Sequence, residues 1–480
     1  MKYLVGIDGG TQSTKVVIFD LLGNIVCQAR QALQPMHMPK PGVAEHPNDD
    51  LWQSLRVACA RVMQEFPHDP KDILGVGLCT IRCCRAELDA TGRLTSPVLS
   101  WMDERLSRPY EATNTATHFV TTSSGYITHR LTGQFRDTAA NYEGPWPIDK
   151  DNGCWSKDPE VLTHFNIPRE QLFELCDPGD ILGQITAEAA AETGLLEGLP
   201  VVATANDKAV EALGSGLRND QTALLSLGTY IGGMVCGDTN KTDARSFFAN
   251  MAAIPGQYLY ECQGIRHGMG TISWFVSLLG QEFAETLAQK GEKAEEILGK
   301  EATAILPGSD GLVCLPEWLA PTDQPYKRGV MLGFHGGHTR AHIFRALLEA
   351  TAMSMHNNFR AMCDELDLEL QALLVSGGGS QSDLMMQILA DVTGIPTRRN
   401  QLTDAAALGA AICTAVALEQ YSSYTDAIEA MVKPGDEFNP DPRNTDFYRR
   451  LNQEVFATIG GQTDPILSRS HELFEQTTNS

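Results

Sequence analysis

The chain has 480 residues, which exceeds one ordinary hydrophobic core and predicts two domains. Hydrophobic residues make up 42% and charged residues 20%, the balance of an ordinary globular protein. The formal net charge of -23 repels nucleic-acid phosphates and anionic membranes, so we expect neither as a partner. No window approaches the length of a membrane-spanning apolar segment, so none is predicted.

The chain opens with MKYLVGID, where an aspartate precedes any apolar stretch long enough for a signal peptide. This start predicts a cytoplasmic protein, in which the twelve cysteines are expected to be reduced thiols. Cys79, Cys83 and Cys84 form one cluster, but no second ligand pair follows at the spacing of a zinc site. His335 and His338 lie in the glycine-rich GFHGGHTR, which predicts a loop rather than a metal site.

Three strands open the chain: KYLVGID, then KVVIFD after a glycine-rich bend, then IVCQARQAL after a turn. The bend leads directly into β-branched Val16 and Val17, which favour a strand over the helix that a dinucleotide-binding fingerprint requires. The bend also lacks the Gly-Lys-Ser/Thr ending of a P-loop. HPNDDLWQSLRVACARVMQEF follows as a predicted helix and ILGVGLCTI as a buried strand, so the first block is expected to be β-β-β-α-β.

A second block begins near Pro200. It predicts a strand in LPVVATAND, a helix in KAVEALGSG, and two strands around a Gly-Thr bend in TALLSLGTYIGGMVCG. AHIFRALLEATAMSMHNNFRAM predicts a long helix, ALLVSGGGSQSDLMMQILADVTG a strand, glycine turn and helix, and DAAALGAAICTAVAL a small-residue helix that could pack tightly. A bend between two strands thus occurs twice, which suggests an internal duplication around a shared cleft.

Two polar segments suggest where the domains end. GDTNKTDARS interrupts the apolar pattern and predicts a domain boundary near residues 237–246. The tail after residue 433 is polar and contains proline, so it is expected to wrap the outside or to fray.

Polar groups at the ends of predicted elements are candidates for chemistry. Asp8 ends the first strand beside the hydroxyls of the bend, so it could hold Mg²⁺ or could cap its turn. Asp207 stands where a strand gives way to a helix, and could be a general base or the N-cap. In SWMDER, Trp101 could stack on the carbon face of a ligand, and Asp103 could accept hydroxyl hydrogens or pair with Arg105.

Eight motifs together resemble the FGGY family of carbohydrate kinases, in order and over nearly the whole chain. They are GIDGGTQSTK, EHPNDDLW, WMDER, YITHRLTG, ANDKAVEALGSG, SLGTY, GGGSQSDLMMQILADVTG and AALGAAICTA. The resemblance implies an α/β fold of two ribonuclease-H-like domains, of the actin and sugar-kinase ATPase type, around a deep cleft. We expect residues 1–240 to form the N-terminal domain, 241–433 the C-terminal domain and 434–480 an extension.

The resemblance also implies a reaction and its residues. The family transfers the γ-phosphoryl group of ATP to a hydroxyl of a sugar or polyol, with Mg²⁺. Asp207 matches the family's catalytic base, and Asp8 matches the carboxylate near the metal. The matches to the nucleotide-binding bends are Thr11, Ser13 and Thr14 in the first, Gly228 and Thr229 in the second, and Gly378, Gly379 and Ser382 in the adenosine turn. The substrate pocket is matched by Arg82, Trp101, Asp103 and Asp207.

Three departures from the family pattern affect the expected substrate. Glycerol-kinase-like members carry Gln-Arg-Glu where this chain has Ile81, Arg82 and Cys83, so a carboxylate that could accept glycerol hydroxyls is missing. The segment before the Leu-Thr-Gly motif is shorter than in the family, which trims part of a pocket wall or subunit contact. Lys208 follows the base, where a neutral residue is commoner, and could lower the pKa of Asp207, meet a substrate carboxylate, or point outward.

The expected function is therefore an ATP-dependent carbohydrate kinase acting on a small-molecule sugar or polyol, a ketose in particular, through a reachable primary hydroxyl. Glycerol kinase is the alternative within this class. A non-catalytic sugar sensor or an actin-like ATPase switch is the alternative from another class, which Asp8 and Asp207 oppose. A homodimer is compatible with the resemblance.

Overall fold

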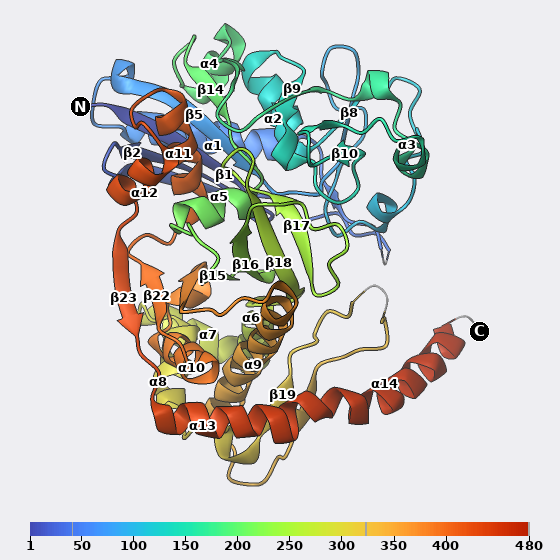
Figure 1. The fold of residues 1–480 in the computed structure, drawn as a ribbon, viewed down its shortest axis with the longest axis vertical. Coiled ribbons are helices and arrows are strands. Elements are labelled where there is room, and N and C mark those ends of the chain that lie inside the picture. Colours follow the sequence, from blue (N-terminus) through green and yellow to red (C-terminus); the bar gives the residue numbers. More distant parts are fainter. Residues whose placement is uncertain (41, 322–323, 479–480) are drawn as a thin grey trace.

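A computed structural model describes residues 1–40, 42–321 and 324–478 of the chain. Two large mixed sheets organise this described part, one above the other in Figure 1, and helices cover their faces. The expected α/β class and its division around two sheets are confirmed.

The first sheet has the strand order β13-β14-β5-β1-β2-β3. Its antiparallel meander consists of β1 Tyr3–Gly9, β2 Ser13–Asp20 and β3 Ile25–Ala32, as the apolar runs and the glycine bend predict. Parallel to β1 run β5 Ile73–Thr80 and β14 Pro200–Ala203, and β13 Ile181–Gln184 pairs antiparallel at the edge. Because parallel strands end at the same edge of a sheet, the residues that follow β1, β5 and β14 meet there.

Helices cover both faces of the first sheet. On one face α1 Asp50–Glu65 packs against β2 and β3, together with α2 Ser123–Thr132 and α4 Ala187–Thr193. On the other face lie α5 Asp207–Gly214 and α11 Ala405–Ala417. Successive strand residues alternate between the two faces, which is the period of an extended chain.

The second sheet repeats the plan of the first, with the order β17-β18-β16-β15-β21-β22-β23. Its antiparallel strands are β15 Thr222–Leu227, β16 Ile231–Gly237, β17 Phe247–Met251 and β18 Tyr258–Ile265. Parallel to β15 and to each other run β21 Ala372–Ser376 and β22 Thr397–Asn400. Its helices are α6 Gly270–Leu278, α7 Gln281–Gln289, α8 Ala294–Thr303, α9 Arg340–Leu366 and α10 Asp383–Thr393.

Shorter elements complete the two domains. The short strands are β4 Glu45–His46, β6 Ala86–Leu88, β7 Val98–Leu99, β8 Phe119–Thr121, β9 Arg136–Thr138, β10 Ile148–Asp149, β11 Cys154–Trp155, β12 Glu174–Cys176, β19 Val313–Leu315 and β20 Val330–Leu332. The short helices are α3 Pro159–Phe165 and α12 Tyr424–Met431.

Three segments belong to a different sheet from the one that the predicted domain boundaries imply. β15 and β16 precede residue 240 yet belong to the second sheet, so the chain changes sheet between β14 and β15. The polar segment 237–246 is instead the surface connection from β16 to β17. α11 falls in the predicted C-terminal domain but packs on β1 and β5. β23 Pro434–Phe438 falls in the predicted extension but pairs with β22.

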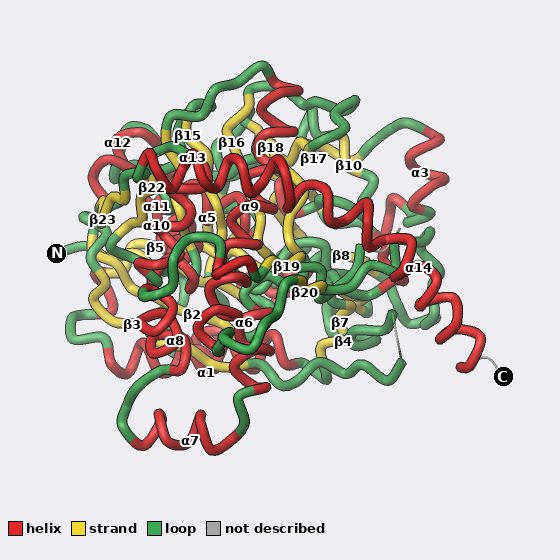
Figure 2. Tube along the Cα trace, turned by 90° about the horizontal axis from the view of Figure 1, so that it is seen from below, coloured by secondary structure: helices red, strands yellow, loops and turns green. Residues whose placement is uncertain are grey.

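The tail beyond β23 is helical rather than irregular. α13 Pro442–Leu451 packs against α10, and a short π-helical segment, Asn452–Phe456, connects it to α14 Ala457–Thr478. α14 runs outward from the body of the molecule in Figures 1 and 2. The polar residues of the tail therefore belong to an exposed helix. The last two residues of the predicted extension lie outside the described part.

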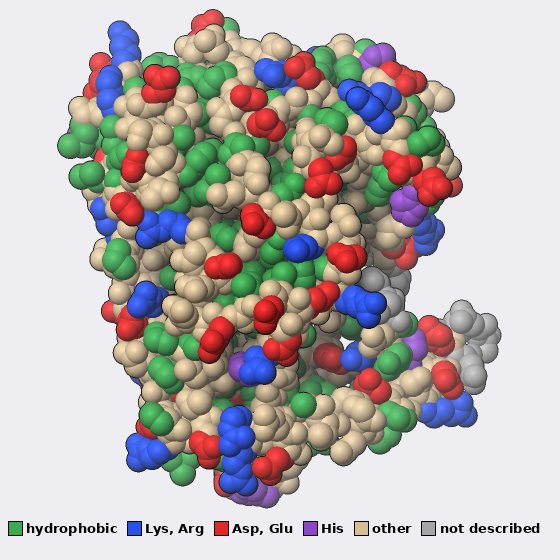
Figure 3. Space-filling model, in the orientation of Figure 1, with side chains coloured by type: hydrophobic (Ala, Val, Ile, Leu, Met, Phe, Trp, Pro, Cys, Tyr) green, Lys and Arg blue, Asp and Glu red, His purple; other side chains and the backbone are tan. Residues whose placement is uncertain are grey.

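No helix within residues 1–40, 42–321 and 324–478 is both long and apolar enough to cross a membrane. On the face in Figure 3, acidic side chains are interspersed with lysine and arginine, and no large basic area gathers there.

Close contact between α5 and α11 joins the two domains. A side chain at Gly214 of α5 would place its Cβ 1.9 Å from the carbonyl oxygen of Ala405. A side chain at Gly409 of α11 would lie 1.9 Å from the carbonyl oxygen of Val210. Since no real Cβ approaches an oxygen so closely, the two helices can adopt this spacing only with glycine at both points.

The first sheet meets α11 equally closely. A Cβ at Gly6 of β1 would lie 2.1 Å from the carbonyl oxygen of Ala407, and one at Gly77 of β5 would lie 2.2 Å from that of Ala410. One continuous hydrophobic core therefore extends from the underside of the first sheet through α5 and α11 into the second domain. The prediction that DAAALGAAICTAVAL forms a tightly packed helix is confirmed.

Gly409→Ala should lower the thermal midpoint, because the added methyl group forces α5 and α11 apart at a cost of roughly 1–3 kcal/mol. Gly299→Ala is the matched control, since Gly299 is also helical, in α8, and a Cβ there would meet nothing within 4 Å. That control should gain about 0.5–1 kcal/mol from the better helix former. Thermal unfolding of both variants measures the difference, and equal midpoints would contradict the packing argument.

Candidate active site

The carboxyl edge of the first sheet brings Asp8 and Asp207 together. Asp8 lies near the end of β1, opposite Lys15 of β2, and Asp207 is the first residue of α5, just after β14. The two carboxylates are close enough for the charge of Asp207 to raise the pKa of Asp8. Because β1 and β14 flank β5 in parallel, this convergence follows from the strand order.

Asp207 does not cap its own helix. The N-cap is Asn206, whose Oδ1 accepts hydrogen bonds from the backbone N–H groups of Lys208 and Ala209 at 3.1 and 3.2 Å. The Asn206 Nδ2 donates to the carbonyl of Ala140 at 2.9 Å, which holds the cap from the other side. Among the described residues, Asp207 Oδ1 is buried and has no hydrogen-bond partner, so this oxygen is available to a bound group.

Several acids share this edge, and their burial raises their affinity for a proton. Burial raises the pKa of Asp207, while Lys208 and Arg82 lower it. Burial also raises the pKa of Asp8 to about 7, against the lowering effect of Lys15. Further negative charges that raise the pKa of Asp8 come from Asp207, Glu211 and Asp404.

This arrangement fits a hard divalent cation. Carboxylate oxygens and water are the ligands that Mg²⁺ prefers, and Asp8 presents a carboxylate here. A bound cation would relieve the mutual repulsion that raises the pKa of Asp8. The unpartnered Oδ1 of Asp207 shows that the protein alone does not satisfy this carboxylate.

The first bend offers fewer hydroxyls than predicted. Ser13 Oγ accepts a hydrogen bond from Arg30 Nε at 2.8 Å, and Thr14 Oγ1 shares a hydrogen bond with Ser54 Oγ at 2.7 Å. Both side chains are buried, since each belongs to β2 and packs on its neighbours. Thr11 alone of the three lies in the bend itself, where its hydroxyl accepts a hydrogen bond from Trp101 Nε1 at 3.3 Å.

The second bend and the adenosine turn lie side by side. Gly228 and Thr229 connect β15 to β16, and Thr229 is exposed. Gly377 has a φ of 78°, and a Cβ there would lie 2.6 Å from the Leu227 carbonyl oxygen, so glycine is required where the turn meets β15.

Within the adenosine turn, the three predicted residues occupy different surroundings. A Cβ at Gly378 would meet nothing within 4 Å, whereas one at Gly379 would lie 2.8 Å from the Leu227 Cβ. Ser382 caps α10 by accepting a hydrogen bond from the backbone N–H of Met385 at 3.3 Å. Its hydroxyl therefore already serves the helix.

Arg82 forms a bidentate ion pair that sequence reasoning missed. Its Nη1 and Nη2 each lie 2.7 Å from an oxygen of Glu261, which is buried in β18 of the second domain. Asn250 Nδ2 also donates to Glu261, at 3.0 Å. A carboxylate therefore stands beside Arg82 after all, although it comes from β18 and not from position 83.

A second ion pair, Glu143 with Lys150, hydrogen-bonds to the backbone of the second domain. Glu143 accepts a hydrogen bond from the backbone N–H of Met251 in β17 at 2.8 Å, and its other oxygen lies 2.6 Å from Lys150 Nζ. Lys150 Nζ also donates to the carbonyl of Ala249, at 2.7 Å. Glu143 and Lys150 are far from every quoted motif, and no pattern in the sequence indicates their role.

The contacts of Asp103 support the alternative of a local ion pair. It accepts hydrogen bonds from Arg105 Nε and Nη2 at 2.8 and 2.6 Å, and from the Ala44 N–H at 2.8 Å. Its side chain is buried, so these bonds leave no oxygen facing a ligand. The predicted substrate role of Asp103 is therefore not supported, whereas Trp101 lies beside Thr11 at the first bend.

Lys208 points inward, not out of the helix start. Its Nζ pairs with Glu211 Oε2 at 2.8 Å, and the side chains of both residues are largely buried. Lys15 also has a defined role, because it pairs with Asp404 just before α11. Neither lysine is left free to meet a substrate carboxylate.

The predicted loop at His335 and His338 is confirmed, and Asp310 lies against it. The Nδ1 atoms of the two histidines accept backbone N–H groups of Gly337 and His335, at 3.0 and 3.2 Å. These bonds place the ring protons on Nε2, where His335 meets Asp310 Oδ2 at 2.9 Å. The lone pair of each Nδ1 is thus engaged by a backbone N–H rather than left for a metal.

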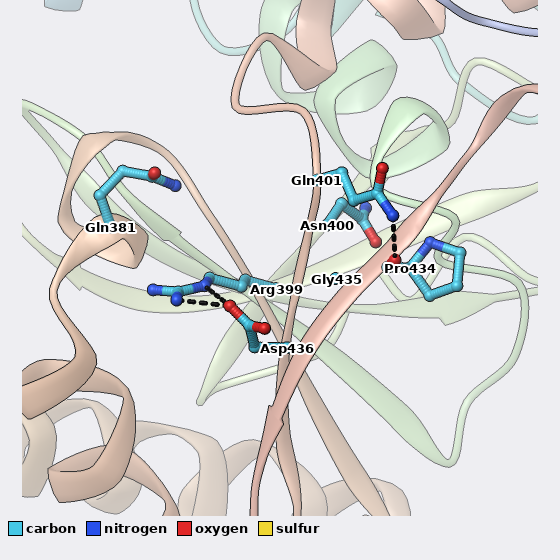
Figure 4. A pocket seen from close by; sticks show the side chains of 7 residues that line it. All are labelled: Gln381, Arg399, Asn400, Gln401, Pro434, Gly435 and Asp436. Carbon is cyan, nitrogen blue, oxygen red and sulfur yellow. Dashed lines mark hydrogen bonds and ion pairs between the residues drawn. The ribbon is translucent and has the colours of Figure 1, made fainter.

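A polar cavity of about 350 Å³ lies at β22 and β23 (Figure 4), and Asp207 is not among the residues that line it. Arg399 in its wall lies 2.5 Å from Asp436 and donates to the Ser380 carbonyl at 2.9 Å. Gln401 donates to the Pro434 carbonyl at 3.1 Å. The side-chain donors that line this cavity are therefore already engaged by other groups of the protein.

Comparisons with known proteins agree with this geometry. The N-terminal domain of the FGGY family of carbohydrate kinases matches residues 3–112 and 106–214, and the C-terminal domain of that family matches residues 223–418. An uncharacterized sugar kinase of Escherichia coli (strain K12), YgcE, is 47% identical over 472 residues, 98% of this chain and 96% of that protein. The autoinducer-2 kinase of Enterobacter sp. (strain 638) is 27% identical over 98% of this chain and 97% of that protein.

A solved structure shares the whole architecture. The crystal structure of xylulose kinase from Rhodospirillum rubrum superposes with a TM-score of 0.80 at 26% identity, covering 97% of this chain and 100% of that one.

Asp8→Asn should stabilise the protein more at high pH than at low pH. The pKa of Asp8 is about 7 in the folded protein against an ordinary value of 3.8, so the folded state binds this proton more tightly. The resulting stability is fully present below pH 3.8 and is lost as the pH rises through 7. Asparagine does not ionise, so the gain in unfolding free energy should be larger at about pH 8 than at about pH 4.

Urea unfolding of parent and variant at both pH values measures this gain. Asp220→Asn, at an exposed position, controls for the loss of one acidic charge. An Asp8→Asn gain that is the same at both pH values would contradict the buried, proton-binding carboxylate.

Proposed function

Because the chain belongs to the FGGY family of carbohydrate kinases, we propose that it phosphorylates a neutral ketose with Asp207 as the general base. The observation that carries the proposal is the buried, unpartnered Oδ1 of Asp207, which shares its edge with Asp8 and Arg82. Asn206 caps the helix, so Asp207 is not needed for local structure.

The residues at this edge suit phosphoryl transfer. ATP with Mg²⁺ supplies the phosphoryl group and neutralises part of its charge when bound. A sugar hydroxyl is a weak nucleophile, and Asp207 would accept its proton within hydrogen-bond reach. Asp8 would hold the metal directly or through water, and the amides of the bends at Thr11 and Thr229 would meet phosphate oxygens. Contact between the domains would exclude water, which competes for the same phosphoryl group.

Charge balance supports an uncharged substrate. Three ion pairs near Asp207 cancel their own charges: Arg82 with Glu261, Lys150 with Glu143, and Lys208 with Glu211. These pairs leave Arg82, Lys150 and Lys208 without a free charge for a substrate carboxylate, which disfavours a sugar acid. Sugar hydroxyls can instead exchange hydrogen bonds with Arg82 and Glu261. The similarity to a xylulose kinase favours a ketose within this class.

Glycerol remains the second candidate for a specific reason. The missing glutamate at Cys83 argued against it, but Glu261 supplies a carboxylate beside Arg82 from the other domain. The choice between ketose and glycerol is therefore one for experiment.

Asp207→Asn should lower kcat by roughly 10²–10⁴-fold, the usual contribution of a positioned general base. The dissociation constant of a nonhydrolysable ATP analogue should stay within about twofold, since this amide replaces only the proton acceptor. A coupled ADP-release assay and calorimetry measure the two quantities. Full turnover by this variant would overturn the assignment of the base.

Xylulose and ribulose should give higher kcat/KM than glycerol, and gluconate should give the lowest, because Arg82 and Lys208 are already paired and leave no cation for its carboxylate. The same ADP-release assay on this panel tests the order. Faster turnover of glycerol would favour the second candidate. ATP hydrolysis without transfer to any sugar would favour a sensor or an ATPase switch instead.

A further inference from the structure

We propose that Lys208 and Glu211 form a positioning pair that ties the helix of the base, α5, to both nucleotide-binding turns. This inference rests on the proposed function, since it assigns a role relative to Asp207 and to bound nucleotide. Both residues lie in the motif ANDKAVEALGSG, and the resemblance assigns neither of them a role in positioning the turns.

The pair is the centre of a buried hydrogen-bond network. Lys208 Nζ donates to Glu211 Oε2 at 2.8 Å and to Ser226 Oγ at 2.7 Å. Ser226 Oγ in turn donates to Glu211 Oε2 at 3.0 Å, and Ser376 Oγ donates to Glu211 Oε1 at 2.5 Å. Both oxygens of one carboxylate are thus used to join three elements, α5, β15 and β21.

The two serines stand immediately before the nucleotide-binding turns. Ser226 precedes Leu227 and the second bend at Gly228, and Ser376 precedes Gly377 and the adenosine turn. β15 and β21 are parallel, and the two serines are direct partners in their register. Glu211 therefore binds both strands at the residues that come just before the two turns. Lys208 directly follows Asp207, the proposed base, in the sequence.

A purely stabilising role does not account for such a pair. Removing two charges from water costs free energy that their attraction often fails to recover, and an apolar pair of similar volume is commonly as stable. The presence of both buried charges at this point is explained if they orient the neighbouring turns. Only 16% of the Lys208 side chain and 12% of the Glu211 side chain are exposed, so solvent does not orient them.

The charges of Lys208 and Glu211 also act on the pKa of Asp207. The charged groups that face it are Asp8 of β1, Arg82 of the loop after β5, and Asp207 of α5 itself. The thiol of Cys79 in β5 lies near the same carboxylates. Lys208 lowers the pKa of Asp207 and Glu211 raises it, so removing one partner shifts the base in a direction that identifies the partner removed.

The experiment compares Lys208→Gln, Glu211→Gln and the double variant with the parent. Glu349→Gln is the matched control, because Arg345 and Glu349 form a similarly buried ion pair in α9, away from the turns. Three quantities are measured: the dissociation constant of a nonhydrolysable ATP analogue, the pH dependence of kcat/KM with xylulose, and the thermal midpoint.

Each single variant should weaken analogue binding by roughly 2- to 30-fold, the range for residues that couple two sites. The acid limb of kcat/KM should move to higher pH in Lys208→Gln and to lower pH in Glu211→Gln, because Asp207 must be ionised to act. The double variant should return the limb toward the parent while analogue binding stays weak. Glu349→Gln should lower the thermal midpoint and leave both other quantities unchanged.

If the Lys208 and Glu211 variants lower only the thermal midpoint, as the control does, the pair is structural and the inference is overturned. Limbs that move in the same direction in both single variants would also overturn it. Failure of the proposed function looks different: the parent would not phosphorylate any sugar, or Asp207→Asn would retain full turnover. The analogue-binding measurement needs no acceptor, so it decides the role of the pair in either case.

Discussion

The contact between α5 and α11 is the constraint on which the rest of the structure depends. Glycines at the crossing let the two backbones touch, and the same helix α11 meets β1 and β5 through Gly6 and Gly77. One hydrophobic core therefore passes from the first sheet into the second domain. Because α5 begins with Asp207, this packing also sets where the proposed base stands relative to the turns at Gly228 and Gly378.

Most charged side chains near this contact form ion pairs. Asp8 and Asp207 carry the negative charge that a metal would relieve, and the neighbouring charged side chains are matched in pairs. Two of these pairs reach across to the second domain, through Arg82 with Glu261 and through Glu143 with the backbone of Met251. The substrate edge is therefore a shared product of both domains.

Much of the fold could be predicted from the sequence, because apolar runs, glycine bends and helical spacing are local signals. Asp207 and Asp8 could be proposed as the base and the metal ligand because they lie in motifs at element ends. Ser13 and Thr14 turn inward because neighbours distant in sequence, Arg30 and Ser54, are their partners. Glu261 and Glu143 were missed for the same reason, since only the packed domains bring them to the site. Asp103 pairs with Arg105, the local alternative that the sequence left open. The boundary at residue 240 failed because a polar surface connection looks the same as a linker between domains.

The position of α11 has a consequence for how the protein is made. Residues 405–417 complete the packing of a sheet whose first strand begins at Tyr3, so a ribosome has synthesised most of the chain before that packing exists. Until then Leu4, Val17 and Phe19 have no covering helix from the C-terminal part of the chain. The first domain is thus the first to be synthesised and among the last to be finished, and its nascent form presents apolar surface for which chaperones and neighbouring chains compete.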